Sequence, residues 1–106
     1  MSFKEQKIEQ LLRELAANFL NKESSGLSLI TVTGVQLSDR LTKATILLSV
    51  FPEDKQDNAL DFAKRKRTEF KEYVRKHARI GVVPLFDFQI DFGEKNRQRI
   101  DELSRQ

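Results

Sequence analysis

Apolar residues near the start of the chain recur at intervals of three and four. Ser2 and Glu5 have the spacing of a capping box, in which each side chain accepts a backbone N–H of the other residue. The apolar positions that follow are Ile8, Leu11, Leu12, Leu15, Ala16, Phe19 and Leu20. This period is typical of an amphipathic helix, and the polar run 21–26 predicts its end and a turn.

The pattern then changes to the two-residue period of β-strands. Residues 29–37 are rich in β-branched side chains, but their alternation slips at Gly34, since Val32 and Val35 have opposite parity. A β-bulge at Gly34 accounts for the slip. In residues 43–51 the apolar positions Ala44, Ile46, Leu48 and Val50 share one face. The short connection predicts that the two strands form an antiparallel hairpin.

A third strand is predicted near the end of the chain. Its apolar residues alternate with polar ones as Phe86, Phe88, Ile90 and Phe92. Gly93 ends the alternation, and a charged tail follows at 94–106, in which Ile100 and Leu103 could support a short helix. We expect residues 1–93 to form one domain.

Between the hairpin and the third strand, a long helical segment is predicted to begin at Asp54, its N-cap, and to end near Gly81. On a helical projection its apolar stripe consists of Ala59, Ala63, Phe70, Val74 and His77. Lys66 and Arg67 interrupt this stripe, so a straight helix would bury two charges at high cost. We therefore predict a bend at 66–68.

The predicted order of elements is α-β-β-α-(bend)-α-β. A three-stranded sheet with helices on one face satisfies every apolar pattern, so the fold class is α+β and the architecture a two-layer sandwich. With 106 residues, one domain is expected. The chain has no cysteine, one histidine and no apolar run long enough to span a membrane. These features favour a cytoplasmic protein without a disulfide or a zinc site.

Basic residues concentrate in the second half of the helical segment. Residues 64–79 hold eight of the nineteen Lys and Arg but only two carboxylates, so this stretch carries +6 while the rest of the chain carries −3. The eight are Lys64, Arg65, Lys66, Arg67, Lys71, Arg75, Lys76 and Arg79. All except Lys66 and Arg67 project opposite the apolar stripe. Such a face favours an anionic partner, because phosphate contacts gain affinity through counterion release.

Nucleic-acid binding is therefore the leading hypothesis, although charge does not separate RNA from DNA. Thr68 at the bend is a candidate hydrogen-bond donor to a phosphate or ribose oxygen, and Arg40 and Lys43 of the hairpin are weaker candidate contacts. The alternative is a protein-interaction module that recruits a partner strand at a sheet edge, with a basic face that only adds solubility.

Evidence for catalysis is weak. No serine has a Gly-x-Ser-x-Gly context, and the four glycines are too far apart to form a phosphate-binding loop. His77, on the apolar side of the helix, is more typical of a hydrogen-bonded packing residue. Asp87 and Asp91 are interpreted as solvated residues of a strand. We expect no catalytic residue, metal or cofactor.

Several segments resemble the ribosome-binding factor A family. Residues 30–38 (Ile-Thr-Val-Thr-Gly-Val-Gln-Leu-Ser), followed by Leu41, Ala44 and 48–50, are similar to the hairpin of that family. The basic helix that leads into Pro84 and a Phe-bearing strand is similar to its second half, and residues 99–103 (Arg-Ile-Asp-Glu-Leu) to its closing segment. The resemblance spans nearly the whole chain.

This resemblance implies a type-II KH-like fold with a helix–kink–helix in place of the Gly-x-x-Gly clamp. It also implies a non-catalytic factor that binds the small ribosomal subunit and its 16S-type rRNA during maturation; we expect it to be monomeric when free. The kink of the family carries Ala-x-Gly, and the corresponding residues here are Lys66, Arg67 and Thr68, where the bend is predicted. Asp39 and Leu85 also depart from the family pattern.

Overall fold

The computed structural model of the protein describes residues 3–23 and 28–93. Within them the elements are α1 (Phe3–Glu23), β1 (Leu29–Leu37), η1 (Asp39–Leu41), β2 (Lys43–Phe51), η2 (Glu53–Lys55), α2 (Gln56–Arg65), α3 (Arg67–His77) and β3 (Leu85–Ile90), where η denotes a single 3-10 turn. Ser2 of the predicted capping box and the predicted tail at 94–106 lie outside the described residues.

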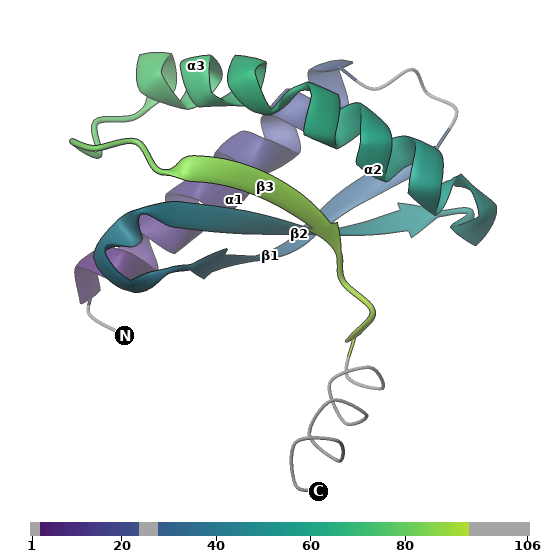
Figure 1. Ribbon diagram of the computed structural model, residues 1–106, viewed down its shortest axis with the longest axis horizontal. Helices are drawn as coiled ribbons and strands as arrows, with labels where there is room; N and C mark the ends of the chain where they lie inside the picture. Colours follow the sequence, from purple (N-terminus) through teal and green to yellow (C-terminus); the bar gives the residue numbers. More distant parts are fainter. Residues whose placement is uncertain (1–2, 24–27, 94–106) are drawn as a thin grey trace, which may run out of the picture.

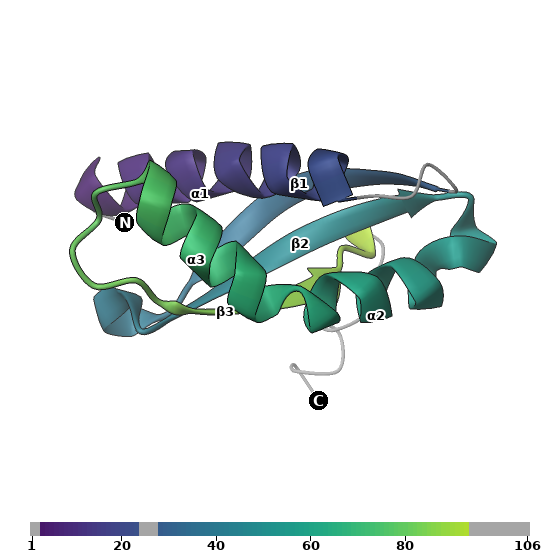
Figure 2. The same cartoon turned by 90° about the horizontal axis from the view of Figure 1, so that it is seen from above.

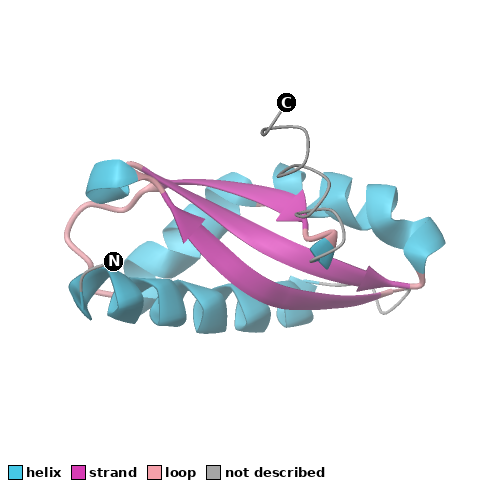
Figure 3. Ribbon diagram, turned by 90° about the horizontal axis from the view of Figure 1, so that it is seen from below, coloured by secondary structure: helices cyan, strands magenta, loops and turns pink. Residues whose placement is uncertain are grey.

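The strands form one mixed sheet in the order β1-β2-β3. β1 and β2 are the predicted antiparallel hairpin, and β3 runs parallel to β2 along its other side. The helices cover one face of this sheet, with α1 over β1 and the α2–α3 pair over β3 (Figures 1 and 2). In the described part of the chain no helix covers the opposite face (Figure 3). The predicted α+β two-layer architecture is confirmed.

The predicted bulge is present in β1. Val32 pairs with Leu48 and Gly34 with Leu47, so Thr33 is the extra residue with no residue opposite it in the β2 register, and its hydroxyl donates to the carbonyl of Leu47. The insertion changes the parity of the strand, and both Val32 and Val35 are buried against the helices as a result.

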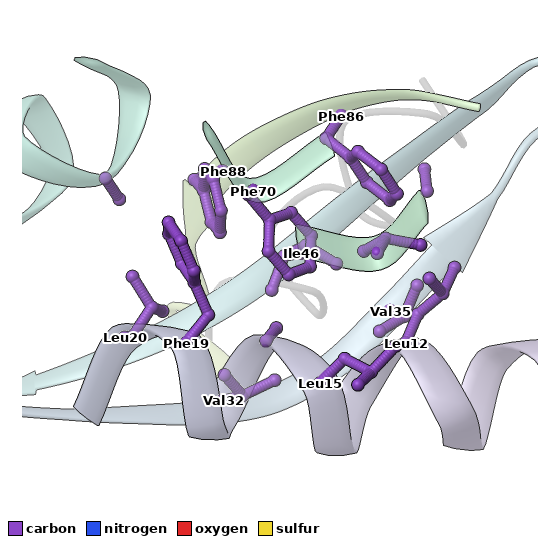
Figure 4. Close-up of a cluster of buried hydrophobic side chains, with 14 of the residues drawn as sticks. Leu12, Leu15, Phe19, Leu20, Val32, Val35, Ile46, Phe70, Phe86 and Phe88 are labelled. Carbon is purple, nitrogen blue, oxygen red and sulfur yellow. The ribbon is translucent and has the colours of Figure 1, made fainter. Parts of the chain in front are cut away.

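The core lies between the two layers and centres on Phe70 of α3, which is fully buried (Figure 4). The centroid of its ring lies 4.7 Å from that of Phe86 and 5.7 Å from that of Phe88, both in β3. Phe19 of α1 contacts the same ring at 5.3 Å. Such aromatic pairs contribute about 0.5–1.5 kcal/mol each beyond the area they bury. This cluster fixes the position of α3 relative to β3.

The predicted bend separates α2 from α3 at Lys66, whose φ of −96° and ψ of 8° depart from helical geometry. Ala63 before the bend and Phe70 after it are both buried. The bend therefore lets both helices turn an apolar side towards the same sheet while the residues between them stay at the surface. This part of the prediction is confirmed.

The start of the helical segment differs from the prediction. Asp54 is not a helix cap but part of η2, where the backbone N–H of Lys55 donates to the carbonyl of Pro52. α2 begins only at Gln56, and no side chain caps its first turn. The 3-10 turn that follows Pro52 thus occupies the residues that were expected to open the helix.

The end of the segment differs as well. α3 ends at His77, because Ala78 is extended, with φ −141° and ψ 147°. Gly81 has the expected left-handed φ of 74°, but it lies in the loop beyond the helix. The chain leaves the helix early because β3 must begin beside β2, where the N–H of Leu85 donates to the carbonyl of Thr42.

The third strand is shorter than predicted. It ends at Ile90, and the side chain of Phe92 is 63% exposed. Asp91 turns the chain, since its carboxylate accepts hydrogen bonds from the N–H of Gly93 (2.8 Å) and the hydroxyl of Thr33 (2.7 Å). The bulged residue of β1 thereby holds the end of β3 from across the sheet.

Candidate nucleic-acid interface

Four basic residues lie along one side of the α2–α3 pair. Lys64, Arg67, Lys71 and Arg75 follow one another at intervals of three or four, which places them on the same side of successive helical turns. This side faces β3, because Lys64 and Arg67 both contact Asp87. We call these four residues the basic stripe.

Three members of the basic stripe, Arg67, Lys71 and Arg75, line an open groove of about 620 Å³ between α3 and the beginning of β3, here called the α3–β3 groove. Its lining residues are Lys43, Arg67, Thr68, Lys71, Glu72, Arg75, Leu85, Phe86 and Asp87. Lys43 reaches the groove from β2 because it pairs with Leu85 in the parallel register. The groove thus brings together five of the residues predicted as nucleic-acid contacts, four of them cations.

Asp87 holds the two cations that flank the bend. Its Oδ1 lies 3.5 Å from Nη1 of Arg67 and 3.9 Å from Nζ of Lys64. The same oxygen accepts the backbone N–H of Phe88 at 2.9 Å, and Oδ2 accepts the side-chain amide of Gln89 at 3.0 Å. The Nε–H of Arg67 also donates to the carbonyl of Lys64 at 3.0 Å. These contacts keep the Arg67 guanidinium at the bend.

Two cations have carboxylate neighbours three residues away in the sequence. Arg75 lies 3.2 Å from Glu72, and Lys66 lies 3.3 Å from Glu69. The ammonium of Lys66 also stands 5.9 Å from the ring centroid of Phe62. Arg67 lines the α3–β3 groove, whereas Lys66 does not. The side chains of these two neighbouring residues at the bend therefore lie on different sides.

The remaining predicted contacts lie elsewhere. Arg65 lines a neighbouring cleft of about 580 Å³ that it shares with Lys64 and Arg67. Arg79 follows the end of α3 and lines a separate cleft beside α1, so its predicted place on the helical basic face is wrong. Lys76 is exposed on α3, and Arg40 is exposed in η1, where its φ is 64°.

Several of these cations are open to an external anion. Among the residues that the structure describes, no carboxylate lies within 4 Å of Lys43, Arg65, Lys71 or Lys76. Lys43 lines the α3–β3 groove from the sheet and Lys71 lines it from the helix, so an unneutralised ammonium group stands on each side. A chain of phosphates is the kind of ligand that fits this arrangement.

The single histidine contacts Tyr73, one turn earlier in α3. The Nδ1 atom of His77 lies 2.8 Å from the carbonyl oxygen of Tyr73, and the two rings stack with centroids 4.2 Å apart. The predicted hydrogen bond is present, but the predicted place on the apolar side is wrong, because His77 is exposed.

Asp87 is a site residue that the sequence patterns did not reveal. Alternation along the third strand places it on the polar side, which suggested plain solvation, yet only 17% of its side chain is exposed. Because β3 is an edge strand, this side chain can reach the end of α2 and the beginning of α3. One feature of the sequence could have indicated this role: Asp87 is an acidic residue on a strand that follows a strongly basic helix.

Neither a metal site nor a membrane-spanning helix is found in the described chain. Over residues 3–23 and 28–93, no group of three His, Asp or Glu is arranged to hold a metal ion. In the same part of the chain, no helix combines the length and the apolar character that a membrane span requires.

Two solved structures have the same fold. The crystal structure of ribosome-binding factor A from Thermus thermophilus superposes with a TM-score of 0.75 at 19% identity, over 84% of this chain and 97% of that one. A solution NMR structure of a Thermotoga maritima protein gives a TM-score of 0.69 at 22% identity, over 85% of this chain and 89% of that one. At these identities the likeness concerns the fold alone.

Sequence comparison identifies the family of this chain. A ribosome-binding factor A from Thermodesulfovibrio yellowstonii is 31% identical over 103 residues, which cover 95% of this chain and 87% of the relative. One from Staphylococcus epidermidis is 28% identical and covers 92% and 89%. The family model described as ribosome-binding factor A matches residues 4–104. This chain therefore belongs to the ribosome-binding factor A family.

Proposed function

We propose that the protein is a non-catalytic rRNA-binding factor that assists maturation of the small (30S) ribosomal subunit in the cytoplasm. Membership of a family named for ribosome binding supports the partner. The α3–β3 groove supports the chemistry of the contact, because it presents Lys43, Arg67, Lys71 and Arg75 on facing walls. That juxtaposition of cations from two layers of the fold is the observation that carries the proposal.

The groove suits a sugar–phosphate backbone better than a set of bases. Its one aromatic lining residue, Phe86, is only 7% exposed and packs on Phe70, so it offers no stacking platform. The hydroxyl of Thr68 can donate to a ribose or phosphate oxygen. Binding then depends mainly on ammonium and guanidinium contacts with phosphates, which position a strand without reading its sequence.

Such a protein acts through binding energy alone. By holding an rRNA strand in the groove, it stabilises one conformation of the immature subunit and excludes competing ones. Four phosphate contacts from the groove predict that log K falls with log salt concentration at a slope of about −2.8, which is ~0.7 per contact for a single strand.

The test is the double variant Lys71→Ala/Arg75→Ala, matched to the control Arg13→Ala/Lys55→Ala. Both remove two cations, but Arg13 and Lys55 lie outside the α3–β3 groove. We expect the groove variant to bind rRNA about 10- to 100-fold more weakly at low salt, with a slope flatter by ~1.4. The control should match the unmodified protein.

Co-sedimentation with purified ribosomal subunits addresses the partner. The proposal predicts salt-sensitive association with small subunits that the groove variant loses. Equal losses for both variants would show that only net charge matters, and an absence of association would contradict the proposal.

A strand-recruiting module remains the second candidate. β1 is a nine-residue edge strand that pairs only with β2 in the described part of the chain. Association through β1 would depend little on salt and would survive the groove variant. The sedimentation experiment therefore separates the two functions.

A further inference from the structure

Asp87 occupies the place in the α3–β3 groove where an external anion would be expected. Two cationic groups and one hydrogen-bond donor surround its Oδ1. Nη1 of Arg67 and Nζ of Lys64 form ion pairs with this oxygen, and the backbone N–H of Phe88 donates a hydrogen bond to it. Phosphate oxygens bound to proteins are also commonly surrounded by cations and a backbone N–H. The carboxylate thus satisfies, from within the chain, groups that a nucleic acid would otherwise contact.

The two ion pairs are weak enough to exchange. Their N···O distances of 3.5 and 3.9 Å are long for charge-assisted contacts, and the side chains of Arg67 and Lys64 are 50% and 36% exposed. Ion pairs whose cation is this accessible contribute little to stability because water and salt screen them. Arg67 and Lys64 can therefore leave Asp87 for a phosphate without disturbing the core.

The carboxylate also changes what the groove attracts. Asp87 and Glu72 lie among the four cations of the α3–β3 groove, so half of that positive charge is offset before a ligand arrives. A short polyanion that reaches only Lys43 and Lys71 leaves both ion pairs of Asp87 in place. A strand that spans the groove brings a phosphate next to Asp87 as well.

We infer that Asp87 is an internal competitor for the phosphate site at the bend, and that it makes binding selective for strands that engage the entire groove. This inference rests on the proposed RNA-binding function and names the residue that regulates its affinity. Asp87 is thus a specificity-determining residue, and Lys64 and Arg67 are the contacts that it withholds.

The experiment compares Asp87→Asn with the unmodified protein for binding to a short oligouridylate. Asparagine keeps an oxygen for the N–H of Phe88 but loses the charge that holds Arg67 and Lys64. We expect the variant to bind about three- to tenfold more tightly, the size expected for two exposed ion pairs, with a slope against log salt steeper by ~0.7–1.4. Unchanged or weaker binding by a folded variant would overturn the inference.

Asp54→Asn is the matched control. It removes the same charge from exposed η2, which does not line the α3–β3 groove. Equal tightening in Asp54→Asn would overturn the inference, because it would reduce the effect to net charge. Thermal unfolding of each variant establishes that it is folded.

A double-mutant cycle with Arg67→Ala keeps the test independent of absolute affinities. If Asp87 withholds Arg67 from the short oligouridylate, then Arg67→Ala weakens binding of that oligonucleotide little in the unmodified protein and about three- to tenfold more in the Asp87→Asn background. Equal costs in both backgrounds would contradict competition. A larger cost in the unmodified protein would overturn it too, because Asp87 would then position Arg67 for binding.

Retention on heparin, a polyanion without bases, separates this inference from the proposed function. If the unmodified protein failed to bind any oligoribonucleotide, the proposed function would fail, yet elution from heparin would still test Asp87. Later elution of Asp87→Asn than of Asp54→Asn supports the competitor role, and co-elution overturns it.

Discussion

At the scale of single residues, the ionisation of Asp87 shows how its neighbours act on the groove. Partial burial raises the pKa of this carboxyl, but the hydrogen bond from Gln89, the N–H of Phe88 and the cations Lys64 and Arg67 outweigh that effect. The net result is a pKa below the usual 3.8. The carboxylate therefore stays charged at every pH at which ribosomes function.

The lowered pKa of Asp87 predicts how the stability of the protein depends on pH. Since the pKa of Asp87 is lowered on folding, its stabilising effect is complete above the unfolded-state value of 3.8 and is lost as the pH falls through the folded-state value. The difference in melting temperature between the protein and Asp87→Asn should stay constant from about pH 8 to 5 and shrink below about pH 4. Calorimetry across this range measures it, and a change near neutral pH would contradict the assignment.

At the scale of elements, the bend between α2 and α3 needs no special residue. Lys66 lies at φ −96°, which any L-amino acid adopts, and Thr68 lies inside the first turn of α3. The Ala-x-Gly expected from the family resemblance is therefore dispensable here. The bend follows from Ala63 and Phe70, which must both be buried on the same sheet.

Substitutions that restore the family pattern test this account. Lys66→Ala should change the free energy of unfolding by less than about 1 kcal/mol, because it removes only surface contacts such as the pair with Glu69. Thr68→Gly should destabilise by only about 0.3 kcal/mol, because glycine loses more conformational freedom in a helix but threonine is itself a poor helix former. Urea unfolding measures both. Stabilisation by Thr68→Gly would mean that the bend does strain the backbone at that residue.

Local patterns predicted most of these elements, and long-range geometry accounts for the differences. The slip at Gly34 and the charges at Lys66 and Arg67 are visible in the sequence because each violates a short period. The end of α3 and the role of Asp87 depend on where β3 lies beside β2, which no local period encodes. For the same reason, the sequence predicted which cations are candidate contacts but not where each one lies. It did not predict that some line the α3–β3 groove, that Lys66 lies at the bend and that Arg79 lines a separate cleft.

At the scale of the whole molecule, the two layers separate stability from binding. Every fully buried side chain in the described residues is apolar, and the cations of the α3–β3 groove lie at the rim where α3 meets β3. Charge in the groove can therefore change without changes in the core. Across the sheet, the hydrogen bond between Thr33 and Asp91 ties the end of β3 to β1, so the last described residues are anchored to the domain.

This arrangement predicts that the domain folds without residues 94–106. The buried apolar residues of the described chain run from Ile8 to Phe88, and Asp91 binds Thr33 before the chain reaches Gly93. A protein that ends at Gly93 should unfold in one cooperative transition. Its melting temperature should lie within about 5 °C of that of the full chain, which corresponds to a change of less than ~1 kcal/mol in the free energy of unfolding. Circular dichroism and a fluorescent probe attached in α1 should report the same transition. A much lower or non-coincident transition would place residues 94–106 within the cooperative unit, and the proposed domain limit would be wrong.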